Sequence, residues 1–301
     1  MKLKILGCHS ATPLENAHTT SQLLEVKDHL FLIDCGEGTQ IQLRQNKIKF
    51  SRIKHIFISH LHGDHFYGLV GLISTFRLLG RTTDLHIYGP KGIKEVLTLQ
   101  LKLANSWTNY NLFFHELEKK ESELIFEDDS LTVYTIPLDH RIYSNGFLFQ
   151  EKQGLRKLDN EKIKNYDIPY CDLHNLKLGK DLILEDGTTL KNKMVTLDPN
   201  PVKRYAFCSD TAYNESIVPL IKEVDMLYHE STFLDVHQNL AKKTKHSTAS
   251  QAAKIARLAQ VKRLVLGHFS SRYSEKNDFL IEASSIFESV SLASDGKIFD
   301  I

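Results

Sequence analysis

Residues 59–65 read Ser59-His60-Leu61-His62-Gly63-Asp64-His65, and this stretch decides the fold. It follows the apolar, β-branched run Ile53-Lys54-His55-Ile56-Phe57-Ile58, which predicts a buried strand. Neutral imidazole nitrogen and carboxylate oxygen are zinc ligands, and a loop that leaves a strand can direct them to one point. A polar turn rich in histidine is the alternative. Four potential ligands in such a short stretch favour a metal site.

The bulk composition limits the class of protein. The chain has 301 residues, a 42% hydrophobic fraction and a formal net charge of +1, so we expect one domain with an insertion and no global basic field for nucleic acid. Any RNA contact must come from local patches. The four cysteines are scattered, which argues against disulfides and against a cysteine zinc site. No signal-peptide pattern and no membrane-length apolar run is visible, so we expect a cytoplasmic protein without a membrane partner.

Short strands alternate with helices along the chain, which predicts an α/β fold. We expect strands at residues 3–6, 22–26, 29–33, 53–58, 85–88, 113–117, 131–136, 146–150, 204–208, 226–228 and 263–266. We expect helices from about residue 39 and at residues 66–79, 91–103, 216–222, 248–258 and 279–289. Between residues 151 and 193 the periodicity fails. This segment predicts an insertion that projects from the core, or an ordinary long surface loop.

The remaining ligands of a metal cluster should also lie at strand ends, and three residues do. His140, Asp210 and His268 each follow a predicted strand. Alone, Asp210 fits a helix N-cap and His268 fits a buried core histidine. Together with the first motif they bring the ligands to seven, enough for two zinc ions if one carboxylate bridges. One zinc would then bind His60, His62 and His140, the other would bind Asp64, His65 and His268, and Asp210 would bridge them.

The motif His60-Leu61-His62-Gly63-Asp64-His65 resembles the H-x-H-x-D-H signature of metallo-β-lactamase-fold hydrolases. This resemblance implies an α/β fold of the αββα sandwich type, with metals at the edge of two facing sheets. It also makes His140, Asp210 and His268 similar to the remaining ligands of that superfamily, in order. The signature is specific for the fold and not for the substrate.

Further stretches are similar to ribonuclease Z, the transfer-RNA 3′-processing endonuclease family. They are Asp34-Cys35-Gly36-Glu37-Gly38-Thr39-Gln40, His65-Phe66-Tyr67-Gly68-Leu69-Val70-Gly71-Leu72, His229-Glu230-Ser231-Thr232, Lys245-His246-Ser247-Thr248-Ala249 and His268-Phe269-Ser270-Ser271-Arg272-Tyr273. Ser231 departs from the alanine that is common there. The resemblance implies one metallo-β-lactamase-fold domain over residues 1–301, with residues 151–193 as a flexible arm, or exosite, that contacts transfer RNA. Ile168-Pro169-Tyr170-Cys171 replaces the Gly-Pro-rich motif often found in that arm.

The activity that the resemblance implies is zinc-dependent, endonucleolytic removal of the 3′ trailer from precursor transfer RNA, which leaves a 3′-hydroxyl on the tRNA. Two Zn²⁺ per subunit, or Mn²⁺ or another divalent ion, would share a hydroxide that attacks phosphorus. Asp64 would orient or deprotonate the attacking water. His246 would donate a proton to the leaving oxygen, and Glu230 would hold its ring and raise its pKa. Arg272 would bind a phosphate.

Other interpretations remain open on the residues alone. His246 fits a solvated histidine in a basic loop, Glu230 a surface acid, and Arg272 a surface salt bridge. A hydrolase of a small phosphodiester, thioester or lactone would share all seven ligands but would need neither the Glu230–His246 pair nor the insertion. A non-catalytic RNA-binding protein should lack a ligand, and none is missing. The resemblance also implies a homodimer that acts on RNA and not DNA, and residues 66–79 have apolar side chains to spare for an interface.

Overall fold

A computed structural model describes residues 1–301, which form two compact units. The larger unit comprises Met1–Glu127, Thr132–Gln150 and Lys203–Ile301, and the smaller one comprises Asp128–Leu131 and Glu151–Val202. None of the helices combines the length and the apolar character that a membrane span requires.

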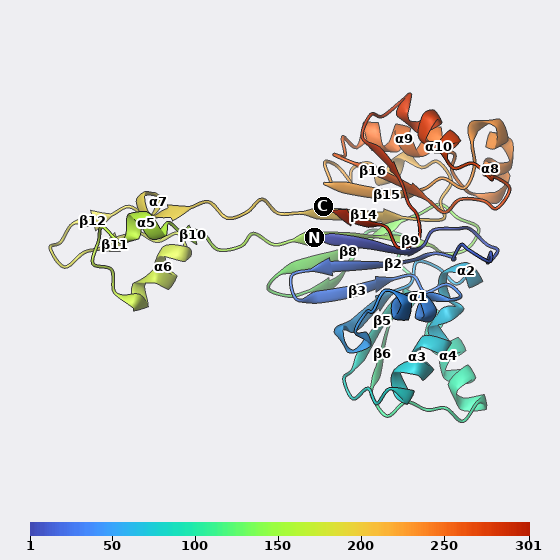
Figure 1. Cartoon of the computed structure of the whole chain (residues 1–301), viewed down its shortest axis with the longest axis horizontal. Coiled ribbons are helices and arrows are strands. Elements are labelled where there is room, and N and C mark those ends of the chain that lie inside the picture. The colour runs from blue at the N-terminus through green and yellow to red at the C-terminus, as the bar shows by residue number, and fades with distance from the viewer. The chain divides into compact units, whose positions relative to one another are not determined.

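The larger unit is built on two seven-stranded sheets (Figure 1). The strand order in the first sheet is β18 (Ile298–Asp300), β1 (Lys2–Gly7), β2 (Ser21–Val26), β3 (His29–Ile33), β4 (Ile53–Phe57), β5 (Leu85–Pro90) and β6 (Leu112–Leu117). The order in the second sheet is β17 (Val290–Leu292), β16 (Leu264–Gly267), β15 (Met226–Glu230), β14 (Arg204–Cys208), β9 (Asn145–Glu151), β8 (Leu131–Pro137) and β7 (Leu124–Glu127). Strands β3 to β6 pair in parallel, as do β14 to β17.

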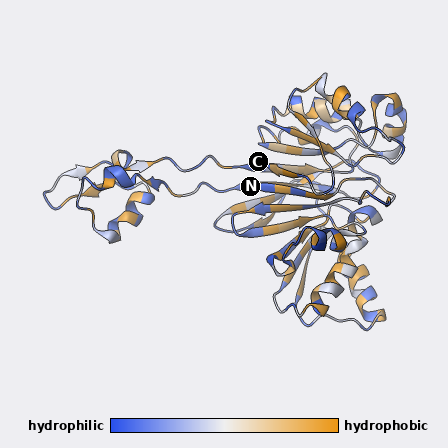
Figure 2. Cartoon of the chain, in the orientation of Figure 1, coloured by the Kyte–Doolittle hydropathy of each residue, from blue (hydrophilic) through white to orange (hydrophobic).

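Helices cover the outer faces of both sheets, which gives the expected αββα sandwich (Figure 1). The first sheet carries α1 (Thr39–Gln45), α3 (Gly68–Leu78) and α4 (Ile93–Leu103), and the second carries α8 (Gln238–Thr244), α9 (Ala249–Leu258) and α10 (Asn277–Ser284). Figure 2 shows hydrophobic residues concentrated in the strands of the two sheets.

Successive side chains of a strand point to opposite faces of the sheet, and in the first sheet both faces are apolar. Leu32 and Ile56 belong to the core under the helices. Their neighbours Phe31 and Phe57 point the other way, and both rings contact Phe149 of the second sheet, with centroids 5.4 and 5.3 Å apart. Parallel strands β3 and β4 are therefore buried between helices and the facing sheet, which explains why they read as continuous apolar runs.

Some elements differ from the sequence prediction. Residues 216–222 do not form the expected helix; only the 3₁₀ turn Glu215–Ile217 forms, because Pro219 cannot donate a helical hydrogen bond. Strand β5 continues to Pro90 instead of ending at Tyr88, since β6 pairs with its last residues. Helix α10 ends at Ser284, and the predicted helix 66–79 divides into α2 (Gly63–Phe66) and α3. The short strands β7, β17 and β18 and helix α8 were not predicted.

The smaller unit has secondary structure and a core of its own. It contains two-stranded sheets, β10 (Lys157–Leu158) with β13 (Thr196–Leu197) and β11 (Leu182–Ile183) with β12 (Thr189–Leu190), and the short helices α5 (Asn160–Ile163), α6 (Leu173–Lys177) and α7 (Asn192–Val195). Leu176, Leu190 and Val195 are buried at its centre. The aperiodic stretch that begins at Glu151 thus forms a compact unit that extends to Val202.

Candidate metal centre

Four of the predicted ligands lie on the loop after β4 and on α2, and a buried carboxylate organises this segment. Asp34, at the end of β3, accepts hydrogen bonds from the backbone N–H and the hydroxyl of Ser59, at 2.7 and 2.8 Å. His65 Nδ1 donates to Asp34 Oδ2 at 2.7 Å, the same oxygen that accepts from the Ser59 hydroxyl. Asp34 is fully buried, and its left-handed backbone (φ 56°) turns the chain at the strand end. Asp34 was not predicted as a site residue, although it opens one of the motifs quoted above.

The other three ligands follow strands of the second sheet. His140 follows β8, Asp210 follows β14 and His268 follows β16. Asp210 and His268 adopt left-handed backbone conformations, with φ of 61° and 60°. Aspartate and histidine tolerate this conformation better than most residues, so each can turn the chain sharply at the strand end. Neither residue has the role suggested by the alternatives, because Asp210 caps no helix and His268 faces the other ligands.

The structure brings all seven side chains together in two groups. Ligand atoms of the first group, and likewise of the second, lie within 4.8 Å of one another; the groups are His60, His62, His140 and Asp210, and Asp64, His65 and His268. Asp210 lies between them. Its Oδ2 atom is 3.5 Å from His60 Nε2, and its Oδ1 atom is 3.1 Å from His65 Nε2 and 3.0 Å from His268 Nε2.

Hydrogen bonds on the outer side fix the orientation of four imidazole rings. The Nδ1 atom donates to Ser59 Oγ in His60 (3.0 Å), to Asp34 in His65, to the Lys245 carbonyl in His140 (2.9 Å) and to Thr232 Oγ1 in His268 (2.8 Å). Each Nε2 therefore faces the centre of the cluster. Such outer contacts are the usual way in which proteins orient metal-binding histidines.

The donor set of the cluster fits a divalent metal. Nε2 of His60 and of His140 both face His62 Nδ1, at 3.0 and 3.2 Å, and a bound cation stabilises such converging lone pairs. Burial lowers the pKa of His60 and His140, and it lowers the pKa of His62 to about 4, so these rings are neutral ligands. These residues form a site for a divalent metal ion.

The second group carries surplus negative charge. Burial raises the pKa of Asp64, but the charge of His65 and hydrogen bonds outweigh it and hold the pKa well below its usual range. Burial lowers the pKa of His65, whereas the carboxylates of Asp210, Asp64 and Asp34 raise it well above its ordinary value. Three carboxylates around one imidazole attract a cation, whether a proton or a metal.

Glu230 and His246 form a buried pair beside the first group. His246 Nδ1 lies 2.8 Å from Glu230 Oε1 and 4.0 Å from Asp210 Oδ2. The side chain of Glu230 is fully buried and that of His246 is 11% exposed, so neither is the surface group that the residues alone suggested. Burial lowers the pKa of His246, but the Glu230 carboxylate overcomes this effect and raises the pKa to about 9. His229 is also buried, but its Nδ1 faces the carbonyl of Glu230.

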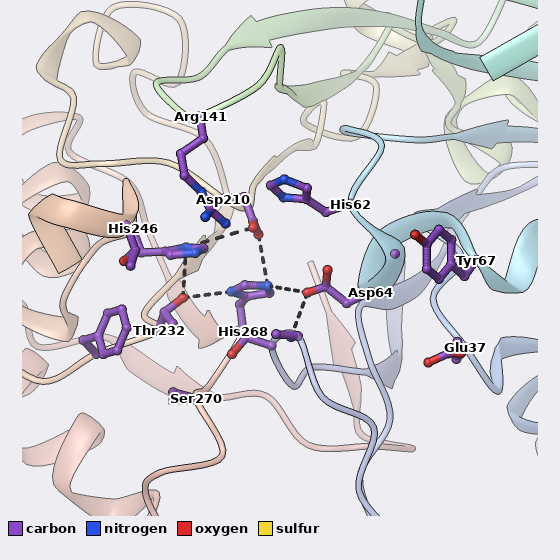
Figure 3. Close-up of a pocket in the computed structure, with 15 residues that line it drawn as sticks. Glu37, His62, Asp64, Tyr67, Arg141, Asp210, Thr232, His246, His268 and Ser270 are labelled. Carbon is purple, nitrogen blue, oxygen red and sulfur yellow. Dashed lines mark hydrogen bonds and ion pairs between the residues drawn. The ribbon is translucent and has the colours of Figure 1, made fainter. Parts of the chain in front are cut away.

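A pocket of about 500 Å³ opens over these groups (Figure 3). Four of the ligands, His62, Asp64, Asp210 and His268, line it together with His246. Further residues complete the wall, among them Ala11, Tyr67, Arg141, Thr232 and Phe233. The Ala11 N–H donates to Asp64 Oδ2 at 2.8 Å.

The predicted phosphate-binding residue, Arg272, does not line the pocket. It is exposed, and its guanidinium carbon lies 5.5 Å from the ring centroid of Phe233 in the pocket wall. Arg141 lines the pocket instead. Arg141 was not predicted as a site residue, and its position directly after the ligand His140 was the available signal.

Known proteins resemble this chain over its whole length. It is 48% identical to ribonuclease Z from Bacteroides thetaiotaomicron over 300 residues, which cover 100% of this chain and 95% of the relative. It is 45% identical to ribonuclease Z from Porphyromonas gingivalis over 297 residues, covering 99% and 98% of the two chains.

Solved structures show the same fold. The crystal structure of the short form of human tRNase Z matches with a TM-score of 0.73 and 29% identity, covering 100% of this chain and 99% of the other. The metallo-beta-lactamase fold protein YhfI from Bacillus subtilis matches with a TM-score of 0.69 and 18% identity, covering 99% and 98%. Residues 1–189 match the family model described as Anti-Pycsar protein Apyc1. The chain therefore belongs to the ribonuclease Z family of the metallo-β-lactamase fold and, through residues 1–189, to the family described as Anti-Pycsar protein Apyc1.

Proposed function

We propose that this protein is an endoribonuclease that removes the 3′ trailer from precursor transfer RNA and leaves a 3′-hydroxyl on the tRNA. The observation that carries this proposal is the buried Glu230–His246 pair at the edge of the metal site, because hydrolysis of a phosphodiester needs a proton donor for its leaving oxygen. Relatives named ribonuclease Z support the choice of substrate.

We assign two zinc ions to the cluster. His60, His62 and His140 would hold one, and Asp64, His65 and His268 the other, with Asp210 between them. Manganese or another divalent ion would also suit imidazole and carboxylate donors. When bound, such ions lower the pKa of water and polarise the phosphoryl group.

Asp64 orients the attacking water by accepting a hydrogen bond from it. The carboxylate lines the pocket and is ionised, as the lowered pKa indicates. Its Oδ2 atom is held by the Ala11 N–H at 2.8 Å and faces His268 Nε2 at 3.4 Å, so this oxygen has a fixed place beside the second group. The water oxygen forms the new bond to phosphorus, and the bond from phosphorus to the ribose 3′ oxygen breaks.

His246 supplies the proton to that leaving oxygen. With a pKa of about 9 its ring is protonated at neutral pH, and Glu230 holds Nδ1 so that the opposite side of the ring is presented to the pocket. Glu230 is itself fixed by Thr211 N–H at 2.8 Å and by the Thr232 hydroxyl at 2.6 Å. Thr232 also accepts a hydrogen bond from His268, so the acid and the metal site share one network.

The decisive experiment incubates metal-loaded protein with trailer-bearing precursor tRNA, beside lactone and thioester substrates, and maps the product ends. We expect cleavage that yields a tRNA 3′-hydroxyl and a trailer with a 5′-phosphate. Asp64→Ala should abolish this cleavage. A variant that processes precursor as fast as wild type, or a wild-type protein that hydrolyses only the small esters, would refute the proposal.

His246→Ala and His62→Ala form a matched pair that separates chemistry from metal binding. His246→Ala should slow cleavage with little loss of zinc. His246 also lies near possible ligand atoms of Asp210, Glu230 and His268, but its Nδ1 donates to Glu230 Oε1 at 2.8 Å and therefore offers no lone pair to a metal. His62→Ala should lose zinc, since Nδ1 of His62 lies among the ligand atoms of the first group. Zinc content by elemental analysis checks both, and comparable zinc loss in the two variants would mean that His246 is misassigned.

We further propose that the smaller unit, which includes the predicted arm 151–193, contacts the transfer RNA. The ring of Tyr170 is 90% exposed there, and exposed aromatic rings stack on RNA bases. Tyr170→Ala should raise the KM for precursor tRNA and leave the KM for a small phosphodiester unchanged. A KM for precursor tRNA equal to that of wild type would show that Tyr170 does not contact the RNA.

The protein should act as a cytoplasmic homodimer. The exposed side chains of Leu78, Leu79 and Leu103, at the ends of α3 and α4, favour a partner surface. Analytical ultracentrifugation tests this state, and a monomer at micromolar concentration would contradict it.

A further inference from the structure

The pocket wall contains one side chain of permanent positive charge, that of Arg141. Figure 3 shows it extending toward His246 and Asp210. Its backbone follows His140 directly, and the hydrogen bond of His140 to the Lys245 carbonyl (2.9 Å) fixes that neighbour. The backbone of Arg141 is thus held beside the metal site, while its guanidinium extends over the pocket.

Arg141 has no hydrogen bond or ion pair within the protein, although an acid is close in sequence. Asp139 pairs with Lys245 instead, whose Nζ lies 3.0 and 2.8 Å from its two oxygens. Lys245 is therefore neutralised, and the exposed guanidinium of Arg141 keeps all its donors. Arg272 differs from Arg141 in its contacts, because its guanidinium lies over the ring of Phe233.

A free guanidinium in this position suits a phosphodiester. Asp64 and Asp210 also face the pocket and repel an anion, so a substrate phosphate needs a compensating charge besides any metal. The planar guanidinium can donate to two oxygens of one phosphate, and donors aimed at oxygens that gain charge in the transition state accelerate the reaction. The position beside His246 places these donors on the side where the leaving oxygen receives its proton.

We propose that Arg141 is a catalytic residue that binds the non-bridging oxygens of the scissile phosphate. The proposal rests on the proposed phosphodiesterase function of the site and adds the residue that recognises the reacting group. It differs from a general contact to the RNA backbone, because a scissile-phosphate contact must act on every phosphodiester that the site hydrolyses, whatever its length.

The test measures kcat and KM on precursor tRNA and on bis(4-nitrophenyl) phosphate for wild type, Arg141→Ala and Arg141→Lys. Arg141→Ala should reduce kcat/KM about 100-fold on both substrates, mainly through kcat, which is the scale for losing one preorganised donor to a transition-state oxygen. Arg141→Lys should lose about 10-fold, since lysine keeps the charge but not the two parallel donors. Added guanidinium ion should partly restore Arg141→Ala.

Arg263→Ala is the matched control. Arg263 is an exposed arginine directly before β16, whereas His268 follows that strand, so it lies at the opposite end from the metal site. Its removal should leave the rate on the small diester unchanged. Zinc content should be the same in all variants, and the melting temperature of both Arg141 variants should match wild type, because Arg141 has no internal partner to lose. Arg263 does donate a hydrogen bond to the Asp300 carbonyl at 3.3 Å, so its variant serves as a control for the rate and not for the melting temperature.

Three results would overturn the proposal. Arg141→Ala could retain the wild-type rate on the small diester, could lose activity on precursor tRNA alone, or could lose zinc, which would mean that it acts through His140. The proposed function fails separately: wild-type protein that hydrolyses the small diester but does not process precursor tRNA refutes that function and leaves Arg141 to be judged on the diester. Wild-type protein that hydrolyses neither substrate overturns both.

Discussion

The contact between Glu230 and His246 determines how the rate of cleavage depends on pH. Burial lowers the pKa of His246, and the Glu230 carboxylate, 2.8 Å from Nδ1, overcomes this and raises the pKa to about 9. His246 is then a protonated acid throughout the neutral range. The rate of wild-type protein should fall at high pH only as this proton is lost, near pH 9.

Glu230→Gln removes the negative charge and leaves the burial in place. The pKa of His246 should then fall toward its ordinary value of 6.5, because burial still lowers it while the Asp210 carboxylate still raises it. At pH 8 the protonated fraction would drop from about 90% to about 3%, so the rate should fall roughly 30-fold relative to wild type. At pH 6 both proteins keep most of their His246 protonated, and their rates should agree within about twofold.

The assay is kcat of metal-loaded protein from pH 5.5 to 9.5, on precursor tRNA and on a small diester. Melting temperatures must accompany it, because Glu230 accepts hydrogen bonds from Thr211, Thr232 and Ser247 and an amide cannot accept all of them. Glu230→Gln with the same ratio of rates at pH 8 and pH 6 as wild type would refute the relay. A decrease in kcat near pH 9 that persists in His246→Ala would refute the relay independently.

Three further predictions concern residues that support the site and the fold. Asp34→Asn should weaken zinc binding about 10–100-fold in a chelator competition, because Asp34 holds His65 Nδ1 at 2.7 Å; unchanged affinity would exclude this role. Burial lowers the pKa of His55 from 6.5 to about 3. Below pH 6.5 the unfolded chain therefore binds more protons than the folded chain, and the stability of the folded chain decreases as the pH decreases. His55→Phe should remove about 2–3 kcal/mol of the stability loss between pH 7 and 4.5 in urea unfolding of the metal-free protein, and an identical loss would contradict this. Gly68→Ala should destabilise the protein by about 1–3 kcal/mol in thermal melts, because a Cβ there would lie 2.1 Å from a backbone carbonyl oxygen. Gly71→Ala should not, because its Cβ would meet only a flexible side-chain oxygen at 3.4 Å. Equal melting temperatures for the two variants would refute this reasoning.

The sequence predicted the ligands better than the residues that support them. His140, Asp210 and His268 each follow an apolar strand, so their position at one sheet edge could be inferred from periodicity and residue type. Asp34 and Thr232 act through hydrogen bonds to residues distant in sequence, which no periodicity records.

The same distinction applies to the arginines and to the secondary structure. Whether Arg141 or Arg272 faces the pocket depends on loop conformation and on the ring of Phe233, which only the folded chain determines. Strands β7, β17 and β18 form because they pair with neighbouring strands, and their few residues carry too little pattern to be predicted alone. Pro219 could have excluded the helix at 216–222.

The division of the ligands between two sheets has a consequence for the synthesis of the protein. The loop after β4 leaves the ribosome long before β14 and β16 are translated, so the nascent chain holds His60 and His65 without Asp210, whose oxygens face both groups. The pocket wall also closes late, because the backbone of Ser10 pairs with Phe269, next to the ligand His268. Nuclease activity can therefore arise only after Asp210 and His268 have been synthesised. Prematurely terminated chains should be inert toward the cell's RNA and not unregulated nucleases.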